Sequence, residues 1–411
     1  MNHATPAVIL RSGHHGGLGI LRSLGRLGVP VYSVDADWWE PSYSSRFCRG
    51  RFFLDTENRP AEESIARLLE IGRKVGGRPL LIPTTDHGAM WVAEHASALD
   101  SEYRFPRQDA ALVRALCDKS RMQELARRSG VPTAQTVVPR SKEHVDQFLE
   151  TAIFPVMVKA TDADRLRRRA GGTKFVIHTP RELLDLYARA GDPETPNLMI
   201  LEFIPGGDWM FDGYFDGDSL CLFGVTGKKI RRFPVNTGVT SLGVCQPNQD
   251  VERTTAAFMQ AIGYRGILDI GYRYDRRDGQ YKVLDVNPRI GCTFRLLTAK
   301  NGIDVARALY LDMTGQPVPA AQAADGRKWV VEDFDLISAF RSWRDGMLTP
   351  GDWLNSFRGV EEAACFSLDD PLPFLAMGLA DCCELYRWYR CRRASRQPSS
   401  PPQAANIVVI Q

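Results

Sequence analysis

Apolar positions in the first hundred residues alternate between short continuous runs and amphipathic stretches. Residues 7–10, 29–34 and 79–83 are short apolar runs typical of buried strands, and the glycine-rich segment RSGHHGGLG follows the first of them. Residues 20–27 and 61–75 carry a helical period. This strand–turn–helix–strand order predicts a small doubly wound α/β domain.

The alternation of extended and helical patterns continues up to about residue 317. A helix is predicted at 118–129, with Asp118 as its N-cap and with Gly130 and Pro132 at its end. Beyond the stretch QPVPAAQAADG the pattern becomes irregular and rich in tryptophan, and RRASRQPSSPPQAAN is typical of a solvated tail.

Four short apolar runs are each interrupted by one ionisable residue. A buried charge without a partner is costly, so such residues normally face a counter-charge, a metal or a ligand. Four of them in one region indicate one shared polar site. They are Lys159 in FPVMVKA, Glu202 in LMILEFI, Asp269 in GILDIGY and Asp285 in YKVLDVN.

Asp269 precedes the turn RYDRRDGQ and Asp285 follows it, and the Asp-Gly in this turn is a hairpin signal. Antiparallel strands would place Asp269 close to Asp285, and Asn287 would share the face of Asp285 because strand side chains alternate. Carboxylate and amide oxygens are hard ligands suited to Mg²⁺ held together with nucleotide phosphates. For either acid alone, an ordinary strand-end position or salt bridge is an equally good interpretation.

Arg289 follows these residues directly in VLDVNPR. Its planar guanidinium could hold a phosphate or a developing acyl-phosphate oxygen. The alternative is a structural ion pair with Asp285.

Composition narrows the function classes without selecting one. The chain has 411 residues, with 52 basic against 49 acidic residues, so its net charge of +3 does not indicate a nucleic-acid partner. Nine scattered cysteines form neither a disulfide pattern nor a zinc-ligand pattern, which favours a reducing cytoplasm. We expect neither a signal peptide nor a membrane helix.

At this point the sequence resembles the ATP-grasp superfamily, from about Asp118 to Thr314. DKSRMQELARRSGVPTAQT is similar to the family's entry helix, which implies that Lys119 is the first nucleotide lysine. FPVMVKA is similar to the strand that carries the family's second nucleotide lysine, which implies that Lys159 contacts the α- and β-phosphates. GILDIGY and VLDVNPR resemble the family's metal strands, with an aspartate at 285 where glutamate is commoner.

LEFIPGGD resembles the hinge between the two subdomains of an ATP-grasp fold. The resemblance implies that Glu202 accepts from the adenine amino group, that the backbone of Phe203 and Ile204 completes the adenine contacts, and that Asp208 binds the ribose.

The resemblance also implies the architecture and the reaction. We expect a Rossmann-like front domain at 1–115, an ATP-grasp domain at 116–317 with subdomains 116–198 and 199–317, and a C-terminal extension at 318–411. The front segments RSGHHGGLG and IPTTDHGAM resemble ligases related to D-aspartate ligase and carboxylate–amine ligases. The implied function is an ATP-dependent carboxylate–amine ligase that forms an acyl-phosphate on Mg²⁺-bound ATP, with Mn²⁺ as a substitute metal and small-molecule substrates.

The loop that covers the phosphates departs from the family pattern, because ATDADRLRRRAGGTKFVI holds few glycines. The sequence leaves open which of its basic residues reaches ATP, and a solvated loop is an equally good interpretation. These residues are Arg165, Arg167, Arg168, Arg169 and Lys174.

Two rival functions remain at this stage. The N-terminal glycine turn could belong to a nicotinamide-dependent oxidoreductase, although the embedded charges would then lack a role. The segment LPFLAMGLADCCELYRWYRCRR could make weak peripheral contact with a membrane, as in a non-catalytic ATP-binding protein of envelope assembly, or could pack on the core as a helix. The sequence indicates neither the substrates nor the oligomeric state.

Overall fold

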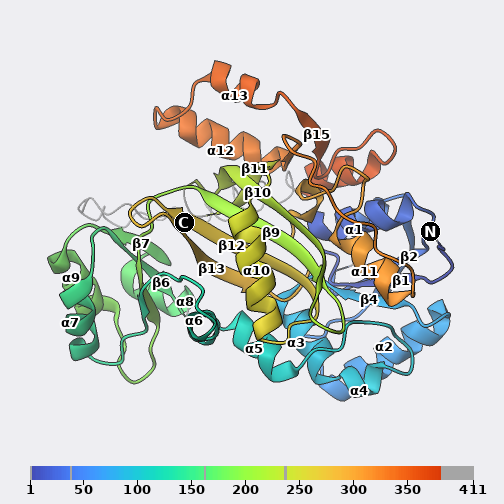
Figure 1. Ribbon diagram of the computed structural model, residues 1–411, viewed down its shortest axis with the longest axis horizontal. Coiled ribbons are helices and arrows are strands. Elements are labelled where there is room, and N and C mark those ends of the chain that lie inside the picture. The colour runs from blue at the N-terminus through green and yellow to red at the C-terminus, as the bar shows by residue number, and fades with distance from the viewer. Residues whose placement is uncertain (1, 38, 162, 236–237, 381–411) are drawn as a thin grey trace, which may run out of the picture.

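The first sheet lies near the N-terminus and has four parallel strands in the order β3-β2-β1-β4 (Figure 1). The computed structural model describes residues 2–380 except 38, 162 and 236–237. Every residue of the central strand β1 is buried, because other elements cover both faces of this sheet. The strands are β1 (Ala7–Leu10), β2 (Val31–Asp35), β3 (Cys48–Phe53) and β4 (Leu80–Pro83).

Helix α1 packs on one face of this sheet, and α2 and α3 pack on the other. The first helix begins at His15, earlier than the predicted residue 20, because the ring of His14 accepts a hydrogen bond from the backbone N–H of Gly16 and caps it. The helical elements here are α1 (His15–Gly25), η1 (Pro41–Ser44), α2 (Ala61–Val75), α3 (Asp86–Glu94) and α4 (Ala96–Leu99).

The second sheet is small and antiparallel, with the order β5-β8-β6-β7. Val158 and Ile200 lie on the face that packs against its helices. The predicted N-cap Asp118 is confirmed, since its side chain accepts from the backbone N–H of Arg121 at the start of α6. The strands are β5 (Thr136–Val137), β6 (Val156–Ala160), β7 (Lys174–Ile177) and β8 (Leu198–Glu202), and the helices are α5 (Ala110–Cys117), α6 (Lys119–Arg128), α7 (Lys142–Thr151), α8 (Ala163–Ala170) and α9 (Pro180–Ala190).

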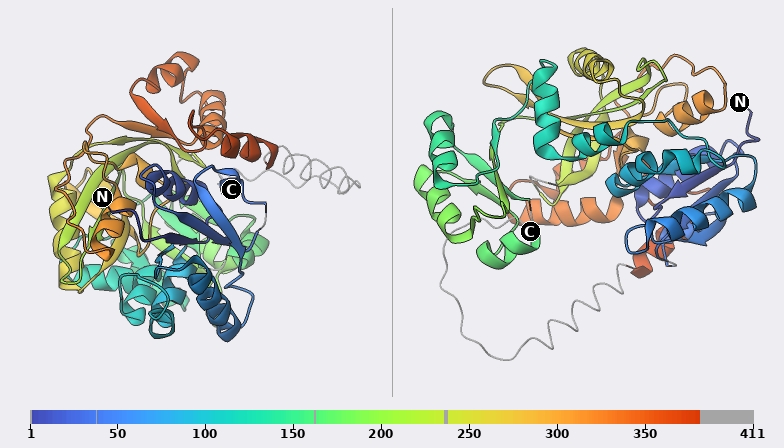
Figure 2. Two further views of the ribbon diagram at one scale, coloured as in Figure 1. Left: turned by 90° about the vertical axis from the view of Figure 1, so that its right-hand side faces the viewer. Right: turned by 90° about the horizontal axis from the view of Figure 1, so that it is seen from below.

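The third sheet has seven strands and lies between the other two, as the view from below shows (Figure 2). Its order is β13-β12-β9-β10-β11-β14-β15, and all neighbours are antiparallel except β14 and β15. Its strands are β9 (Asp208–Phe215), β10 (Cys221–Phe233), β11 (Val239–Cys245), β12 (Gly266–Asp275), β13 (Gln280–Asn287), β14 (Lys328–Val330) and β15 (Val360–Ala363). The helical elements around it are α10 (Gln249–Ala261), η2 (Phe294–Leu296), α11 (Val305–Met313), α12 (Glu332–Arg344) and α13 (Pro350–Ser356).

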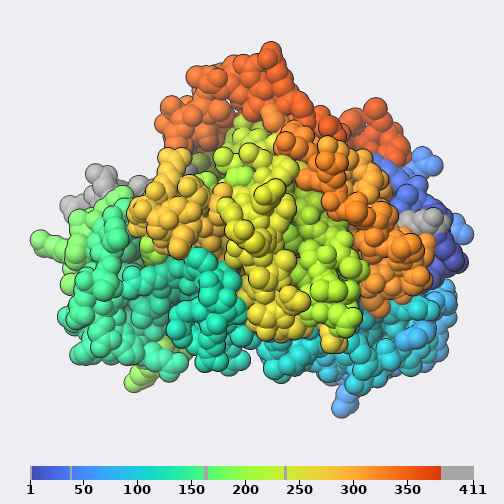
Figure 3. Space-filling model, viewed as in Figure 1, coloured from blue at the N-terminus to red at the C-terminus, as the bar shows by residue number. Residues whose placement is uncertain are grey.

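The C-terminal extension contributes to the central sheet. Strand β14 pairs with β11 and β15 pairs with β14, so residues after 317 widen the sheet, while α12 and α13 project above it (Figures 1 and 3). Strand β8 pairs with β6 in the small sheet, so the chain leaves that sheet only after Glu202, slightly beyond the subdomain boundary expected at residue 198. The division into domains 1–115, 116–317 and 318–411 remains a proposal.

A buried ion pair ties the extension to the front domain. Arg22 donates from Nε to Asp370 Oδ2 at 2.9 Å, and the two side chains are 3% and 1% exposed. Because removal of one partner leaves a buried charge uncompensated, we expect Asp370→Ala to lower the free energy of unfolding by about 3–5 kcal/mol. Chemical denaturation followed by circular dichroism measures this change.

The neighbouring pair Arg26–Asp369 provides the control. Its N–O distance is also 2.9 Å, but the side chains are 28% and 44% exposed. Asp369→Ala should therefore cost less than about 1 kcal/mol. Equal losses in the two variants would contradict the structural role given to Asp370.

Among the described residues, no helix is both long and apolar enough to cross a membrane. The solvated tail predicted at the C-terminus, and most of the segment considered for membrane contact, lie outside the described residues.

Candidate active site

Two carboxylates and one amide meet on β12 and β13. Asp269 lies opposite Asn287, and Asn287 Nδ2 donates to Asp269 Oδ2 at 3.3 Å. Asp285 lies opposite Gly271, where a Cβ atom would stand 2.7 Å from Asp285 Oδ1, so glycine leaves space for this carboxylate. The predicted hairpin is confirmed, with Gly279 in its turn at φ +73°.

A third acid, Asp212, lies beside Asp269 on the neighbouring strand β9. It is 1% exposed, and neither of its carboxylate oxygens has a hydrogen-bond donor among the described residues. Burial, followed by the negative charge of Asp269, raises the pKa of Asp212 well above its usual range. Burial also raises the pKa of Asp269. A cation bound at this row of acids would relieve both penalties.

Three lysines predicted as nucleotide ligands converge on Asp285. Lys159 and Lys174 face each other on β6 and β7. Lys119 donates from Nζ to the backbone oxygen of Leu284 at 2.7 Å. Burial alone would raise the pKa of Asp285, but the charges of Lys119, Lys229 and Lys159 outweigh it and lower the pKa.

The same cluster makes Lys159 an unusual lysine. Burial lowers its pKa to about 8; the positive charges of Lys119 and Lys174 act in the same direction, and Asp285 opposes them. Burial and Lys119 also lower the pKa of Lys174. Such a cluster of partly desolvated positive charges favours a polyanionic ligand.

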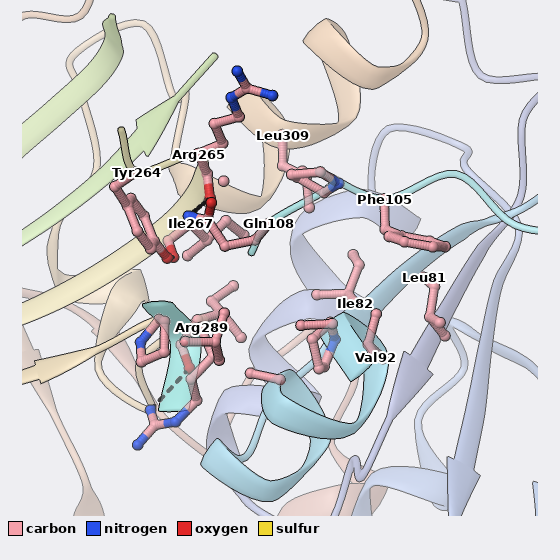
Figure 4. A pocket seen from close by; sticks show the side chains of 18 residues that line it. Leu81, Ile82, Val92, Phe105, Gln108, Tyr264, Arg265, Ile267, Arg289 and Leu309 are labelled. Atoms are coloured by element: carbon pink, nitrogen blue, oxygen red, sulfur yellow. Dashed lines mark hydrogen bonds between the residues drawn. The ribbon is translucent and has the colours of Figure 1, made fainter. Parts of the chain in front are cut away.

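Arg289 joins the end of β13 to the front domain. Its Nε donates to Asp86 Oδ1 at 2.7 Å, and its terminal nitrogen lies 3.9 Å from Asp269 Oδ2. The alternative ion pair with Asp285 is not among its contacts. A cavity of about 70 Å³ lies between the domains beside Arg289, and Figure 4 shows the guanidinium pointing away from the apolar side chains of Phe105 and Val92.

A small, largely buried apolar cluster lies on the same face of the small sheet as Lys159. Met157, Met199 and Leu201 form it, and Phe203 packs against them. Strand alternation places Met157 and Lys159 on one face, away from the helices. The flat ring of a nucleobase suits such a cluster.

The two hinge acids are engaged by basic partners. Glu202 pairs with Arg277 and accepts from Lys282 Nζ at 3.3 Å. Asp208 pairs with Arg273 Nε at 2.5 Å and with Arg232 Nε at 2.7 Å. The expected contacts of Glu202 with adenine and of Asp208 with ribose therefore compete with ion pairs and remain predictions, as do those of Phe203 and Ile204.

Several other basic candidates turn toward structural partners. Arg165 and Arg169 of α8 pair with Asp192 at 2.6 and 3.2 Å. Arg295, six residues after Arg289, is largely buried and pairs with Glu362 at 2.7 Å. Of the basic residues in the phosphate-loop region, Lys174 lies in the lysine cluster, near Lys119 and Asp285.

Sequence reasoning missed Asp212, Lys229 and Asp86. Asp212 carried the same signal as the acids that were found, since it interrupts the apolar strand sequence WMFDGYF. Lys229 lies in the basic stretch KKIRRF, where charge alternation did not single it out. Asp86 lies in the quoted segment IPTTDHGAM, but no local pattern pairs it with Arg289, which is 203 positions away.

Comparison with known proteins agrees with this geometry. No protein-family model matches the chain. D-aspartate ligase of Enterococcus faecium is 28% identical over 278 residues, which cover 65% of this chain and 64% of the ligase. The match thus spans just under two thirds of that relative, and 44% of another, the C-terminal section of the carbamoyl phosphate synthase large chain from Methanopyrus kandleri.

Solved structures show the same fold. N5-carboxyaminoimidazole synthetase from Staphylococcus aureus, complexed with ADP, gives a TM-score of 0.60 at 14% identity and covers 80% of this chain and 82% of its own. L-amino acid ligase from Bacillus licheniformis gives 0.53 at 14% identity, with 75% and 74% covered. Together with the lysine cluster of the small sheet and the acidic strands of the central sheet, these similarities show that the chain has the ATP-grasp fold.

Proposed function

We propose that the chain is an ATP-dependent carboxylate–amine ligase that works through an acyl-phosphate and releases ADP and phosphate. The observation that carries the proposal is the convergence of Lys119, Lys159 and Lys174 on the strands that hold Asp269 and Asp285. Such a site neutralises a triphosphate with its metal. Similarity to D-aspartate ligase and to an ADP-bound synthetase supports it.

The donor set fits Mg²⁺, with Mn²⁺ as a substitute. Asp269, Asp285 and Asn287 offer two carboxylates and an amide oxygen, and the unpartnered oxygens of Asp212 lie next to them. Within the described part of the chain, no three His, Cys, Asp or Glu side chains are arranged as a complete metal site by themselves. A metal shared with nucleotide phosphates needs only one or two protein carboxylates. When bound, Mg²⁺ supplies charge neutralisation at the transferred phosphoryl group.

The nucleotide lies between the small sheet and the metal strands. Its base packs on Met157, Met199 and Leu201, with the backbone of Phe203 and Ile204 at the edge. Lys159 and Lys174 bind the phosphates from one side, and Lys119 does so from the start of α6, where its Nζ lies against β13. Asp208 turns to the ribose only if Arg232 or Arg273 releases it.

In this reaction the chain mainly positions the substrates and neutralises the charge of the phosphates. A substrate carboxylate oxygen attacks the γ-phosphorus, and the bond to the ADP oxygen breaks. Arg289 stabilises the negative charge on the acyl-phosphate, and Asp86 holds its guanidinium in place. The amine nitrogen then attacks the acyl carbon, phosphate leaves, and the amine proton passes to solvent.

A paired substrate screen tests this proposal. Phosphate and ADP release are measured with Mg-ATP over pairs of amino acids and small carboxylates, beginning with D-aspartate because of the E. faecium relative. We expect ADP formation that requires both substrates and a mass-spectrometric product equal to their sum minus water. ADP formation without any joined product would contradict the ligase proposal.

The rival functions predict different binding. A nicotinamide-dependent enzyme would bind NADH tightly and would not respond to ATP, which isothermal titration with NADH and with Mg-ATP decides. The embedded lysines and acids favour ATP, because they would have no role toward a nicotinamide at the front turn.

A further inference from the structure

We propose that Asp35 and Glu40 form a subsite of the front domain that binds the ammonium group of an amino acid, whose carboxylate is the group activated by ATP. The inference rests on the proposed function and names the class of its carboxylate substrate.

Both acids face one point beside the exposed Gly13, in the turn after β1. A Cβ atom at Gly13 would lie 2.5 Å from Glu40 Oε1 and 3.2 Å from Asp35 Oδ2. Asp35 is 3% exposed, and its Oδ2 has no hydrogen-bond partner among the described residues. Its other oxygen, Oδ1, already accepts from the backbone N–H of Ala36 at 2.7 Å. The backbone N–H of Gly13 also acts on this carboxylate, but it does not make a well-aligned hydrogen bond to Oδ2. A buried acceptor therefore faces an accessible turn with its hydrogen-bonding capacity unfilled.

The charges around this point favour the binding of a small cation. Burial, together with the negative charge of Asp35, raises the pKa of Glu40 to about 7. Arg11 lies 3.6 Å from Asp35 Oδ1 and 3.4 Å from Glu57 Oε1. It therefore pairs with Oδ1 of Asp35 and not with Oδ2, the oxygen that faces Gly13. An ammonium group would give hydrogen bonds to both free acceptors and would relieve the repulsion between the carboxylates.

Backbone strain marks the same place. Arg11 adopts φ +67°, a left-handed conformation that is unfavourable for a residue with a side chain. Such strain is concentrated at ligand sites, where the surrounding structure holds it. The turn also lies at the carboxyl end of β1, which separates β2 on one side from β4 on the other, and this is where open α/β sheets bind ligands.

The turn leads directly to the catalytic strands. His14 follows Gly13, and its Nδ1 lies 3.5 Å from Cys292 Sγ, three residues after Arg289. An ammonium held between two carboxylates stays protonated and cannot attack an acyl group. It therefore anchors its molecule, and the carboxylate of the same molecule is drawn toward Arg289. A free amino acid has this pair of groups.

Binding measurements on the full chain test the subsite without turnover. Isothermal titration uses alanine and aspartate in both enantiomers, the remaining proteinogenic amino acids, and the des-amino analogues propionate and succinate. Mg-ADP is titrated in parallel. The variants are Glu40→Gln, which removes one carboxylate, and Gly13→Ala, which places a methyl group at the shared point. Glu62→Gln, on the exposed first turn of α2, is the charge-matched control.

We expect at least one amino acid to bind about tenfold more weakly to Glu40→Gln and to Gly13→Ala than to the wild type and the control. Its des-amino analogue should bind the wild type no better than it binds Glu40→Gln, and Mg-ADP affinity should be unchanged in all proteins. Equal binding of analogue and amino acid, or no amino acid that distinguishes wild type from Glu40→Gln, overturns the subsite. Failure of Mg-ADP to bind the wild type overturns the proposed function instead.

Discussion

The Asp285→Asn variant should lose about 10²–10³-fold in kcat for ADP formation, while its fold stays intact. Asp285 lies among Lys119, Lys159 and Lys229, and in the proposed function it gives the metal a hard oxygen ligand beside Asp269. Asparagine keeps the shape but removes the charge that balances the lysines and attracts the metal. We therefore also expect the Mg²⁺ concentration for half-maximal rate to rise. Initial rates at varied Mg²⁺ and saturating ATP measure both effects.

Asp278 in the same hairpin provides the matched control. Its side chain is 40% exposed and lies 3.1 Å from Lys282 Nζ in a surface ion pair. Asp278→Asn makes the same chemical change outside the lysine cluster and should leave the rate within about twofold of the wild type. Wild-type kinetics and an unchanged Mg²⁺ dependence in Asp285→Asn would refute its assignment as a metal ligand.

The part of the site that the sequence predicted consists of charges within apolar strands. A buried charge is so costly that an acid or lysine in such a run must have a partner, and Asp269, Asp285 and Lys159 do meet in one region. The turn that pairs two of these strands was also visible, since Asp-Gly between alternating runs specifies a hairpin.

The site contacts that the sequence did not predict join segments that are distant along the chain. Asp212 becomes significant only because β9 lies against β12, and Asp86 only because α3 of the front domain meets the end of β13. The ion pairs of Glu202 and Asp208 likewise join the hinge to the β12–β13 hairpin and to β10. No local period encodes such contacts, because they depend on tertiary packing.

The extension shows the same limit. Its irregular pattern suggested little regular structure, yet β14 and β15 complete the central sheet. Strands of three and four residues are too short to show a reliable alternation, so the edge of the existing sheet determines their conformation.

The affinity for Mg-ATP should fall about tenfold between pH 7 and pH 9 because of Lys159. Its pKa in the free protein is lowered to about 8, so the side chain is largely charged at pH 7 and largely neutral at pH 9. Phosphates bind the charged form, so above pH 8 binding must first restore a proton. The Kd therefore rises with pH, and isothermal titration at pH 7, 8 and 9 in two buffers reports both this change and the proton uptake.

Two substitutions distinguish the effect of deprotonating Lys159 from the effect of removing its side chain. Lys159→Arg keeps a positive charge over this whole range, so its affinity should depend much less on pH, even if the longer head group binds less well at pH 7. Lys159→Ala should bind weakly at every pH, because the charge is absent throughout. Lys174 adds a smaller contribution, since burial and Lys119 lower its pKa too. If the wild type and Lys159→Arg show the same pH profile, the titrating group is not Lys159, and the cluster does not hold the phosphates in the way proposed.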